Sequence, residues 1–182
     1  LILHTTELDY KRYKTSFNNK KPILFGNFSG FLKGEHVFKK LKSLLNSNNY
    51  NYTIEKLNCK YNPRIHKSYK EYNIEKQNFY LDRDIFIQLS LSEGYSYATL
   101  DAFACGNVII ATNVGLTYKD VPDDCYVKLD YKKINDIDYL LEKLKYAWDN
   151  RYVLSKNARQ FFLDNCKFDK WNNKMFDIVN KK

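Results

Sequence analysis

Residues 84–112 read DIFIQLSLSEGYSYATLDAFACGNVIIAT, and this stretch decides the fold. Residues 84–89 form a short apolar run that predicts a buried strand. Residues 97–105 predict a helix that ends at Gly106, because glycine commonly follows the last turn of a helix. The run 108–111 is apolar at every position, as in a strand that is buried on both faces. A strand, a helix and a second strand in this order indicate a parallel pair joined by a crossover helix.

The rest of the chain repeats this alternation. Further strands are predicted at 23–25, 52–57 and 126–129, and further helices at 32–45, 134–148, 151–165 and 168–180. Residues 59–82 have a weaker pattern that predicts one or two short helices. Strands that alternate with helices predict an α/β fold with a doubly wound, mostly parallel sheet, which is a Rossmann-like domain flanked by helices.

The domain organisation follows from the first polar stretch of the chain. Residues 1–21 lack periodicity and end in a turn-rich segment, so we expect an N-terminal arm or linker there. Residues 22–182 then form one domain, with C-terminal helices over 134–180. There is no apolar run of about 18 residues to span a membrane and no signal-peptide layout. The four cysteines form no CxxC pair, so we expect a cytoplasmic protein without a zinc site.

Positive charge is concentrated in the first half of the chain. The 30 Lys and Arg residues exceed the 21 Asp and Glu residues and give a net charge of +9. Residues 1–90 contain 16 of the basic and 8 of the acidic residues, and therefore +8 of this charge. Dispersed lysines usually keep a surface soluble, so we expect no nucleic-acid partner. A basic nucleic-acid-binding protein is kept as an alternative, as is peripheral contact with an anionic membrane.

Two loops follow predicted strands at the edge where sheets of this kind bind ligands. The first, residues 26–34, has three glycines and places Lys33 near a helix N-terminus, where backbone N–H groups favour an anion. The second, residues 90–96, contains Glu93, and Asp101 follows about one turn into the next helix. Both carboxylates are expected to face the crevice, where their oxygens can accept hydrogen bonds from sugar hydroxyls.

Backbone amides complete the second loop. The N–H groups of Gly94, Tyr95 and Ser96 are expected to point out of the helix N-terminus, where they suit phosphate oxygens. One segment therefore offers acceptors for hydroxyls and donors for an anion, which is what a nucleotide sugar needs. The alternative is that Ser96 only caps a core helix and that Glu93 is solvated. Spacing alone leaves both open.

Residues 92–112 resemble the signature SEGFGLPxLEAMACGxPVIAT of GT4-type retaining glycosyltransferases, which have the GT-B fold. The two acids of that family's E-x7-E motif correspond to Glu93 and Asp101. Four further parts of the chain resemble other segments of the same family pattern: Gly26 with Lys33-Gly34, Asp84–Ile87, Asn113–Gly115 and Arg151–Trp171. Together they cover about residues 22–180, which corresponds to the nucleotide-sugar-binding C-terminal half of a GT-B enzyme.

The resemblance implies a role for each matching residue. Glu93 and Lys33 are implied as catalytic: Glu93 contacts the donor-sugar hydroxyls near the reacting carbon, and Lys33 neutralises the β-phosphate as it leaves. Asp101 is implied to hold the ribose hydroxyls. The implied donor-binding residues are Gly26, Asn27, Gly30, Gly94, Tyr95, Ser96, Tyr97 and Asp101. The implied activity is that of a hexosyltransferase with a nucleotide-diphosphate sugar as donor and with neither a metal nor another cofactor.

Four positions depart from the family's pattern: the second acid is Asp101, Ser96 replaces a glycine, Ala98 a proline and Asn27 an arginine. Lys33 is therefore the remaining cation of the first loop, and Arg64 and Lys60 are candidates for a second one. The likeness covers only half of a two-domain fold, so an acceptor-binding N-terminal domain or subunit is an expected partner. A non-catalytic module that binds a nucleotide or a nucleotide sugar is the alternative.

One further motif points to different chemistry. Asp82-Arg83-Asp84 has the DxD form by which GT-A glycosyltransferases bind a divalent cation. Apolar strand residues follow it directly, and Asp84 matches the aspartate that begins the strand in the GT4 pattern. We therefore expect Asp84 to have a structural role.

Overall fold

The computed structural model describes residues 6, 8–9, 11–17, 21–47, 50–59, 62–117 and 121–180. Within these residues, five strands form one sheet: β1 (Ile23–Gly26), β2 (Thr53–Lys56), β3 (Ile85–Gln88), β4 (Val108–Thr112) and β5 (Val127–Leu129). Neighbouring strands pair in parallel in the order β2-β1-β3-β4-β5. The parallel α/β sheet predicted from the sequence is confirmed.

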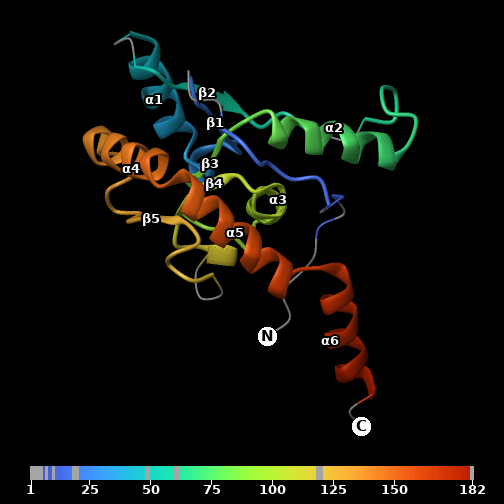
Figure 1. The fold of residues 1–182 in the computed structure, drawn as a ribbon. Helices are drawn as coiled ribbons and strands as arrows, with labels where there is room; N and C mark the ends of the chain where they lie inside the picture. The colour runs from blue at the N-terminus through green and yellow to red at the C-terminus, as the bar shows by residue number, and fades with distance from the viewer. Residues whose placement is uncertain are drawn as a thin grey trace.

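Helices cover both faces of the sheet (Figure 1). They are α1 (Glu35–Ser47), α2 (Tyr69–Leu81), α3 (Tyr97–Cys105), α4 (Ile137–Asp149), α5 (Arg151–Asn165) and α6 (Phe168–Asn180), with short 3-10 turns η1 (Phe31–Lys33) and η2 (Gly115–Thr117). Helices α1 and α4 share a core with one face, whereas α2, α3 and α5 share a core with the other. The sheet is therefore doubly wound, as expected.

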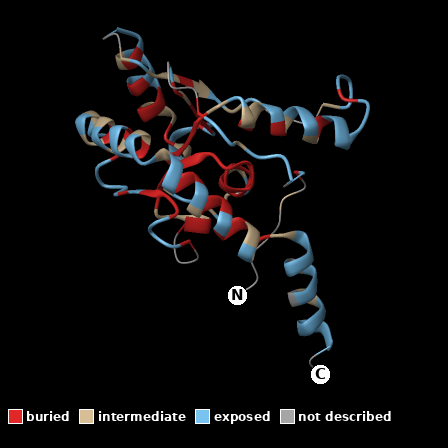
Figure 2. Cartoon of the chain, in the orientation of Figure 1, coloured by how far each residue is buried: buried red, intermediate tan, exposed pale blue. Residues whose placement is uncertain are grey.

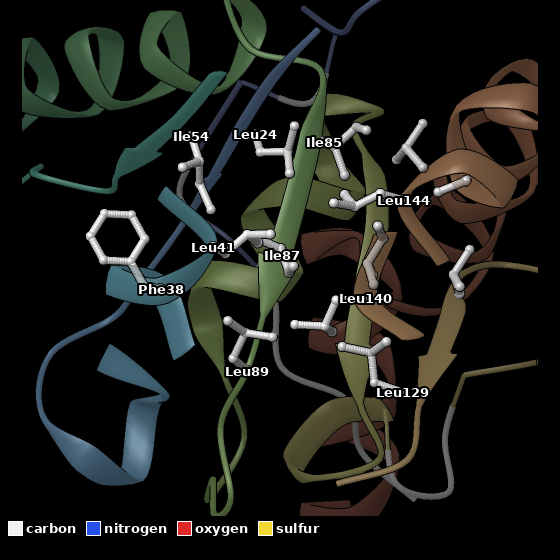
Figure 3. Packing of buried hydrophobic residues seen from close by; sticks show 14 of the residues in the cluster. Leu24, Phe38, Leu41, Ile54, Ile85, Ile87, Leu89, Leu129, Leu140 and Leu144 are labelled. Atoms are coloured by element: carbon white, nitrogen blue, oxygen red, sulfur yellow. The ribbon is translucent and has the colours of Figure 1, made fainter. Parts of the chain in front are cut away.

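Alternating strand residues supply the two cores. In β3, Ile85 and Ile87 join the core beneath α1 and α4, whereas Phe86 joins the core beneath α2, α3 and α5. Figure 3 shows the first of these cores, where Leu41 of α1 and Leu140 of α4 meet the strand side chains. Every residue of β3 and β4 is buried. Burial on both faces explains why these strands are nearly continuous apolar runs in the sequence.

Most helix boundaries match the prediction. Helices α3, α5 and α6 have the predicted bounds, and α3 ends before Gly106. Helix α1 begins later than expected because Gly34, with a φ of 75°, separates the turn η1 from the helix. Within the described part of residues 59–82 there is one 13-residue helix, α2, instead of short pieces. Ser68 caps the N-terminus of α2, because its Oγ accepts a hydrogen bond from the Glu71 N–H at 3.2 Å.

The described part of the N-terminal arm packs against the domain. Leu8 is buried in the core with α3 and α5, and Phe17 is buried in the opposite core. The backbone N–H of Lys14 donates to the Cys105 carbonyl oxygen at 2.8 Å. The division of the chain at residue 21 stays a prediction, but residues of this arm contribute to the core of the domain.

The surface helix α6 differs from the others. It extends away from the sheet, and most of its residues are exposed (Figures 1 and 2). Among the residues whose burial is described, its exposed apolar side chains are Phe168, Phe176, Ile178 and Val179. Among the described residues, no helix is both long enough and apolar enough to cross a membrane.

Gly26 ends β1 where the backbones of β1 and β3 approach each other. A Cβ at this position would lie 2.1 Å from the Ile87 carbonyl oxygen and 2.7 Å from the Phe28 ring. We therefore expect Gly26→Ala to lower the free energy of unfolding by about 3 kcal/mol, since two strands must move apart. At Gly94 a Cβ has nothing within 4 Å, so Gly94→Ala should cost less than about 0.5 kcal/mol. Urea denaturation measures both values, and equal losses would contradict this account of β1.

Candidate functional site

The chain changes direction across the sheet at β1. It passes from β1 outward to β2 and then returns to place β3 on the other side of β1. In open parallel sheets such a reversal leaves a crevice at the carboxyl ends of the two central strands, because their crossover connections leave in opposite directions. Residues 27–34 follow β1 and residues 89–96 follow β3, so these two loops flank the crevice.

A cavity of about 340 Å³ lies at these strand ends. Its lining residues come from the two loops, β3 and the start of α3: Asn27, Lys33, Phe86, Gln88, Ser90, Glu93, Tyr95, Ser96, Tyr97 and Ala98. A cavity of about 330 Å³ lies between the N-terminal arm and α5, and one of about 570 Å³ lies between the arm and α2. The first cavity lies at the strand ends, where sheets of this kind bind ligands, although the cavity beside α2 has the larger volume.

Lys33 and Glu93 form an ion pair in this cavity. The Lys33 Nζ contacts the Glu93 Oε1, and the Ser90 hydroxyl donates to the same oxygen at 2.8 Å. The Glu93 side chain is 12% exposed and that of Lys33 is 29% exposed, so the pair is only partly accessible to water. Glu93 is therefore held in place by two partners, which contradicts the expectation of a freely solvated carboxylate.

Contacts between the two loops bring this pair together. The Leu91 N–H donates to the Leu32 carbonyl oxygen at 2.8 Å, next to Lys33 in the turn η1. Gly34 lies against Leu89, where a Cβ would be 2.5 Å from the Leu89 Cβ. The turn after β1 is thus pressed directly onto the loop after β3, and this close packing places the lysine beside the glutamate.

Ser96, the residue directly before α3, has a left-handed conformation with φ 66° and ψ 73°. This conformation explains why the family pattern has glycine here, since glycine adopts it without steric cost. Ser96 makes no side-chain cap bond to the helix. Its hydroxyl instead donates to the Gln88 Oε1 at 2.8 Å and lies 2.6 Å from the Thr99 Oγ1. Ser96 therefore occupies the N-cap position of α3 but does not cap the helix through its side chain.

The structure brings together most of the residues that the sequence singled out. Asn27, Lys33, Glu93, Tyr95, Ser96 and Tyr97 line the same cavity. Gly94 lies in an adjoining cavity of about 320 Å³ that shares Glu93 and includes the turn at Asn113–Gly115. Gly26 and Gly30 are not lining residues: Gly26 is buried at the end of β1, and the Gly30 N–H donates to the Glu35 Oε2 at 3.2 Å. Their roles in donor binding stay predictions.

Asp101 lies outside this lining and has partners of its own. Its carboxylate is buried, accepts a hydrogen bond from the Thr6 hydroxyl, and lies 3.1 Å from the Lys76 Nζ. Burial lowers the pKa of Lys76, but the negative charge of Asp101, its hydrogen bond to Lys76 and the nearby Tyr72 and Tyr69 together raise that pKa above its usual value. The predicted role of Asp101 in holding ribose hydroxyls is untested.

Sequence reasoning missed two polar residues of the cavity, Gln88 and Ser90. Gln88 is a buried amide at the end of an otherwise apolar strand, and Ser90 positions Glu93. The available signal was a single polar side chain within the apolar run 85–89, since a buried polar group needs a hydrogen-bond partner. Of the two candidates for a second cation, Arg64 is exposed in the segment before α2 and lies outside the lining, and Lys60 falls outside the described residues.

The alternative sites have structural roles. Asp84 is buried, pairs with Lys14 at 3.2 Å, and accepts a hydrogen bond from the Ile23 N–H at 3.0 Å, so it joins the arm to β1. Burial raises the pKa of the Cys105 thiol well above its usual value, which fits a packed side chain rather than a nucleophile. In the described ranges, no group of three or more His, Cys, Asp or Glu residues is arranged to hold a metal ion.

Comparison with solved structures identifies the class of fold. The chain is similar to sucrose-phosphate synthase from Thermosynechococcus elongatus, with a TM-score of 0.70 and 16% identity over 100% of this chain and 52% of that one. It is similar to HepE from Anabaena, solved in complex with UDP and glucose, with a TM-score of 0.70 and 12% identity over 100% and 56% of the two chains. The fold is therefore that of the C-terminal domain of a GT-B glycosyltransferase.

The sequence places the chain within this class. Residues 19–161 match the family described as "Glycosyl transferases group 1", and the chain belongs to that family. It also resembles the C-terminal domain of the group 1 protein LpcC from Francisella tularensis, with a TM-score of 0.55 and 18% identity over 92% of this chain and 97% of that one. A comparison with curated proteins gives no significant match. The chain spans about half the length of the first two neighbours.

The buried pair of Asp101 and Lys76 makes a prediction about stability. Asp101→Asn leaves the Lys76 ammonium partly buried without its counter-charge, and we expect it to lower the free energy of unfolding by about 2 kcal/mol. Lys76→Met removes the unpaired positive charge. The double variant should therefore lose less free energy of unfolding than the two single variants lose in sum. Urea denaturation of the three variants measures this coupling, and additive losses would show that the pair has no energetic significance.

Proposed function

We propose that this chain is the donor-binding domain of a GT4-type retaining glycosyltransferase and that its cavity binds a nucleotide-diphosphate sugar. The observation that carries the proposal is the placement of Lys33 and Glu93 at one cavity with the start of α3. A cation and a helix N-terminus favour a diphosphate, and a carboxylate favours sugar hydroxyls. Membership of the glycosyl transferases group 1 family supports the reaction class.

The reaction makes opposite electrostatic demands at the two ends of the broken bond. When the bond between the anomeric carbon and the phosphate oxygen breaks, its electron pair goes to the diphosphate and the sugar becomes positively charged. A hydroxyl oxygen of the acceptor then forms the new bond to that carbon, and its proton goes to the oxygen of the departing diphosphate. In this proposal Lys33 stabilises the diphosphate, and Glu93 stabilises the sugar. The proposal requires no metal ion, since the lysine and backbone N–H groups supply the positive charge.

The ion pair gives both residues a defined starting position. Before the donor binds, each of them neutralises the other in a site that is largely shielded from water. When a diphosphate enters, Lys33 shifts from the carboxylate to a phosphate oxygen, and Glu93 is left to accept hydrogen bonds from the sugar. The hydrogen bond from Ser90 keeps the carboxylate in place during this exchange.

A second domain or subunit would supply the acceptor. The chain spans about half of neighbours such as sucrose-phosphate synthase, and we propose that acceptor binding belongs to a part comparable to their other half. Helix α6 provides a surface for such a contact, because it extends from the body and exposes Phe168, Phe176, Ile178 and Val179 (Figure 2). In this proposal the chain alone binds the donor but transfers no sugar.

Nucleotide binding tests the proposal directly. Isothermal titration calorimetry with UDP, GDP and ADP should detect binding of at least one of them, and UDP comes first because HepE was solved with it. Lys33→Ala should weaken that binding about tenfold or more, since a charged contact to phosphate is lost. Lys39→Ala removes the same charge from an exposed position on α1 and is the control. A folded protein that gives no heat with any of the three would overturn the proposal.

The ion pair predicts that its two members act in opposite directions. Glu93→Gln removes a negative charge beside the diphosphate and frees Lys33, so the affinity for UDP should stay equal or rise. The same variant should bind the sugar nucleotide with a smaller advantage over UDP, because an acceptor for sugar hydroxyls is weakened. Titration of wild type, Glu93→Gln and Lys33→Ala with both ligands measures these changes. A loss of UDP affinity in Glu93→Gln as large as in Lys33→Ala would contradict the assigned roles.

A further inference from the structure

Gln88 is a buried amide at the carboxyl end of β3, and it lines the same cavity as Lys33 and Glu93. The residue is 4% exposed and follows three buried apolar residues of the strand. The resemblance to GT4 enzymes assigned it no role. Burying an uncharged polar side chain is unfavourable unless it is hydrogen-bonded, because the carbonyl oxygen and the NH2 group of its amide both lose their contacts with water.

One end of this amide has a clear structural function. The Gln88 Oε1 accepts hydrogen bonds from the Ser96 hydroxyl at 2.8 Å and from the Thr99 hydroxyl. These bonds connect the end of β3 to the first turn of α3. One of them fixes the hydroxyl of Ser96, which has a left-handed conformation directly before the helix.

The other end has no such function in the free protein. Among the described residues, the Gln88 Nε2 is buried and has no hydrogen-bond partner. Buried donors are nearly always paired, because an unmade hydrogen bond costs more than a made one contributes. A donor left unpaired in the wall of a ligand cavity indicates that the acceptor comes from the ligand.

The charge of the cavity indicates which kind of acceptor this is. Among the described residues of its lining, Lys33 and Glu93 are the charged ones, and their formal charges cancel. Asn27 in this lining is uncharged, so Lys33 is the cation from the loop after β1 that a diphosphate in this cavity meets. Neutral N–H donors must then contribute more to its binding. The Gln88 amide lies at the start of the nine-residue helix α3, where the helix dipole also favours an anion.

We propose that Gln88 binds the donor: its Nε2 donates a hydrogen bond to a phosphate oxygen at the N-terminus of α3, while its Oε1 holds Ser96 and Thr99. This inference rests on the proposed function, since it assigns one more contact within the same site. Neighbouring side chains cover Nε2 in the free protein, so the phosphate oxygen reaches it after a side-chain movement in the cavity.

The test separates the two ends of the amide. Gln88→Met keeps the size of the side chain and removes both ends, whereas Thr99→Val removes one hydroxyl partner of Oε1 and leaves Nε2 unchanged. Calorimetry with UDP and with pyrophosphate should show a loss of affinity of about 10- to 100-fold in Gln88→Met. It should show less than a threefold loss in Thr99→Val. Uridine, followed by NMR chemical shifts, lacks phosphate and should bind both variants like the wild type.

A second variant covers the case in which Gln88→Met does not fold, as judged by circular dichroism. Gln88→Glu keeps an oxygen for Ser96 and Thr99 but presents a second oxygen to the phosphate. It should therefore weaken the binding of UDP and pyrophosphate more than the binding of uridine. Two results would overturn the inference: an equal loss of UDP affinity in Gln88→Met and Thr99→Val, or a loss of affinity for uridine as large as that for UDP. In either case the amide would affect binding only by stabilising the fold.

The outcomes for the two proposals differ. If Gln88→Met binds UDP and pyrophosphate as tightly as the wild type, the inference about Gln88 fails and the donor-binding function stands. If the wild type binds pyrophosphate but no nucleotide, the proposed function fails, and the loss in Gln88→Met still decides the role of the amide. If the wild type binds neither ligand, both proposals are overturned.

Discussion

The parallel pairing of β1 with β3 is the constraint on which the site depends. Gly26 permits this pairing, because its missing side chain leaves room for the Ile87 carbonyl oxygen. With the two strands side by side, their loops meet at the same edge of the sheet, and the bond between Leu91 and Leu32 joins them. Lys33 and Glu93, far apart in the sequence, become an ion pair as a consequence. The site is therefore a property of the strand order rather than of either loop alone.

Much of the fold follows from the sequence, for identifiable reasons. Strands β3 and β4 are buried on both faces, so their apolar runs are distinctive, and Gly106 marks the end of α3. Helix α2 is different because two of its three buried residues are tyrosines and the third is a glutamine, and these produce no apolar stripe. Its length could not be predicted from periodicity. The arm at residues 1–21 also lacks periodicity, yet Leu8 and Phe17 are buried through contacts with distant helices that local pattern does not encode.

In the site, too, local sequence pattern predicts some features, whereas others depend on contacts between distant parts of the chain. The residues of the two loops were predicted because a strand end in a doubly wound sheet limits where a loop can lie. The surroundings of Asp101 were not predictable, since its partners Thr6 and Lys76 come from other parts of the chain. The sequence spacing placed both acids on one segment, but the helix turns Asp101 toward α2 and the arm. Spacing along a helix defines a face, whereas tertiary packing decides what that face contacts.

The distribution of charge argues for recognition by directed hydrogen bonds. Residues 1–90 contain nearly all of the net charge of +9, yet the described part of the cavity lining has one lysine and one glutamate. Other described lysines lie away from it, as on the exposed side of α1 at Lys39 and Lys40. An electrostatic field from dispersed surface lysines is screened within about 10 Å at moderate salt and has no preferred geometry. Selective binding of a diphosphate at this cavity must then come from donors fixed at the strand ends and at the start of α3, whose positions the pairing of β1 with β3 determines.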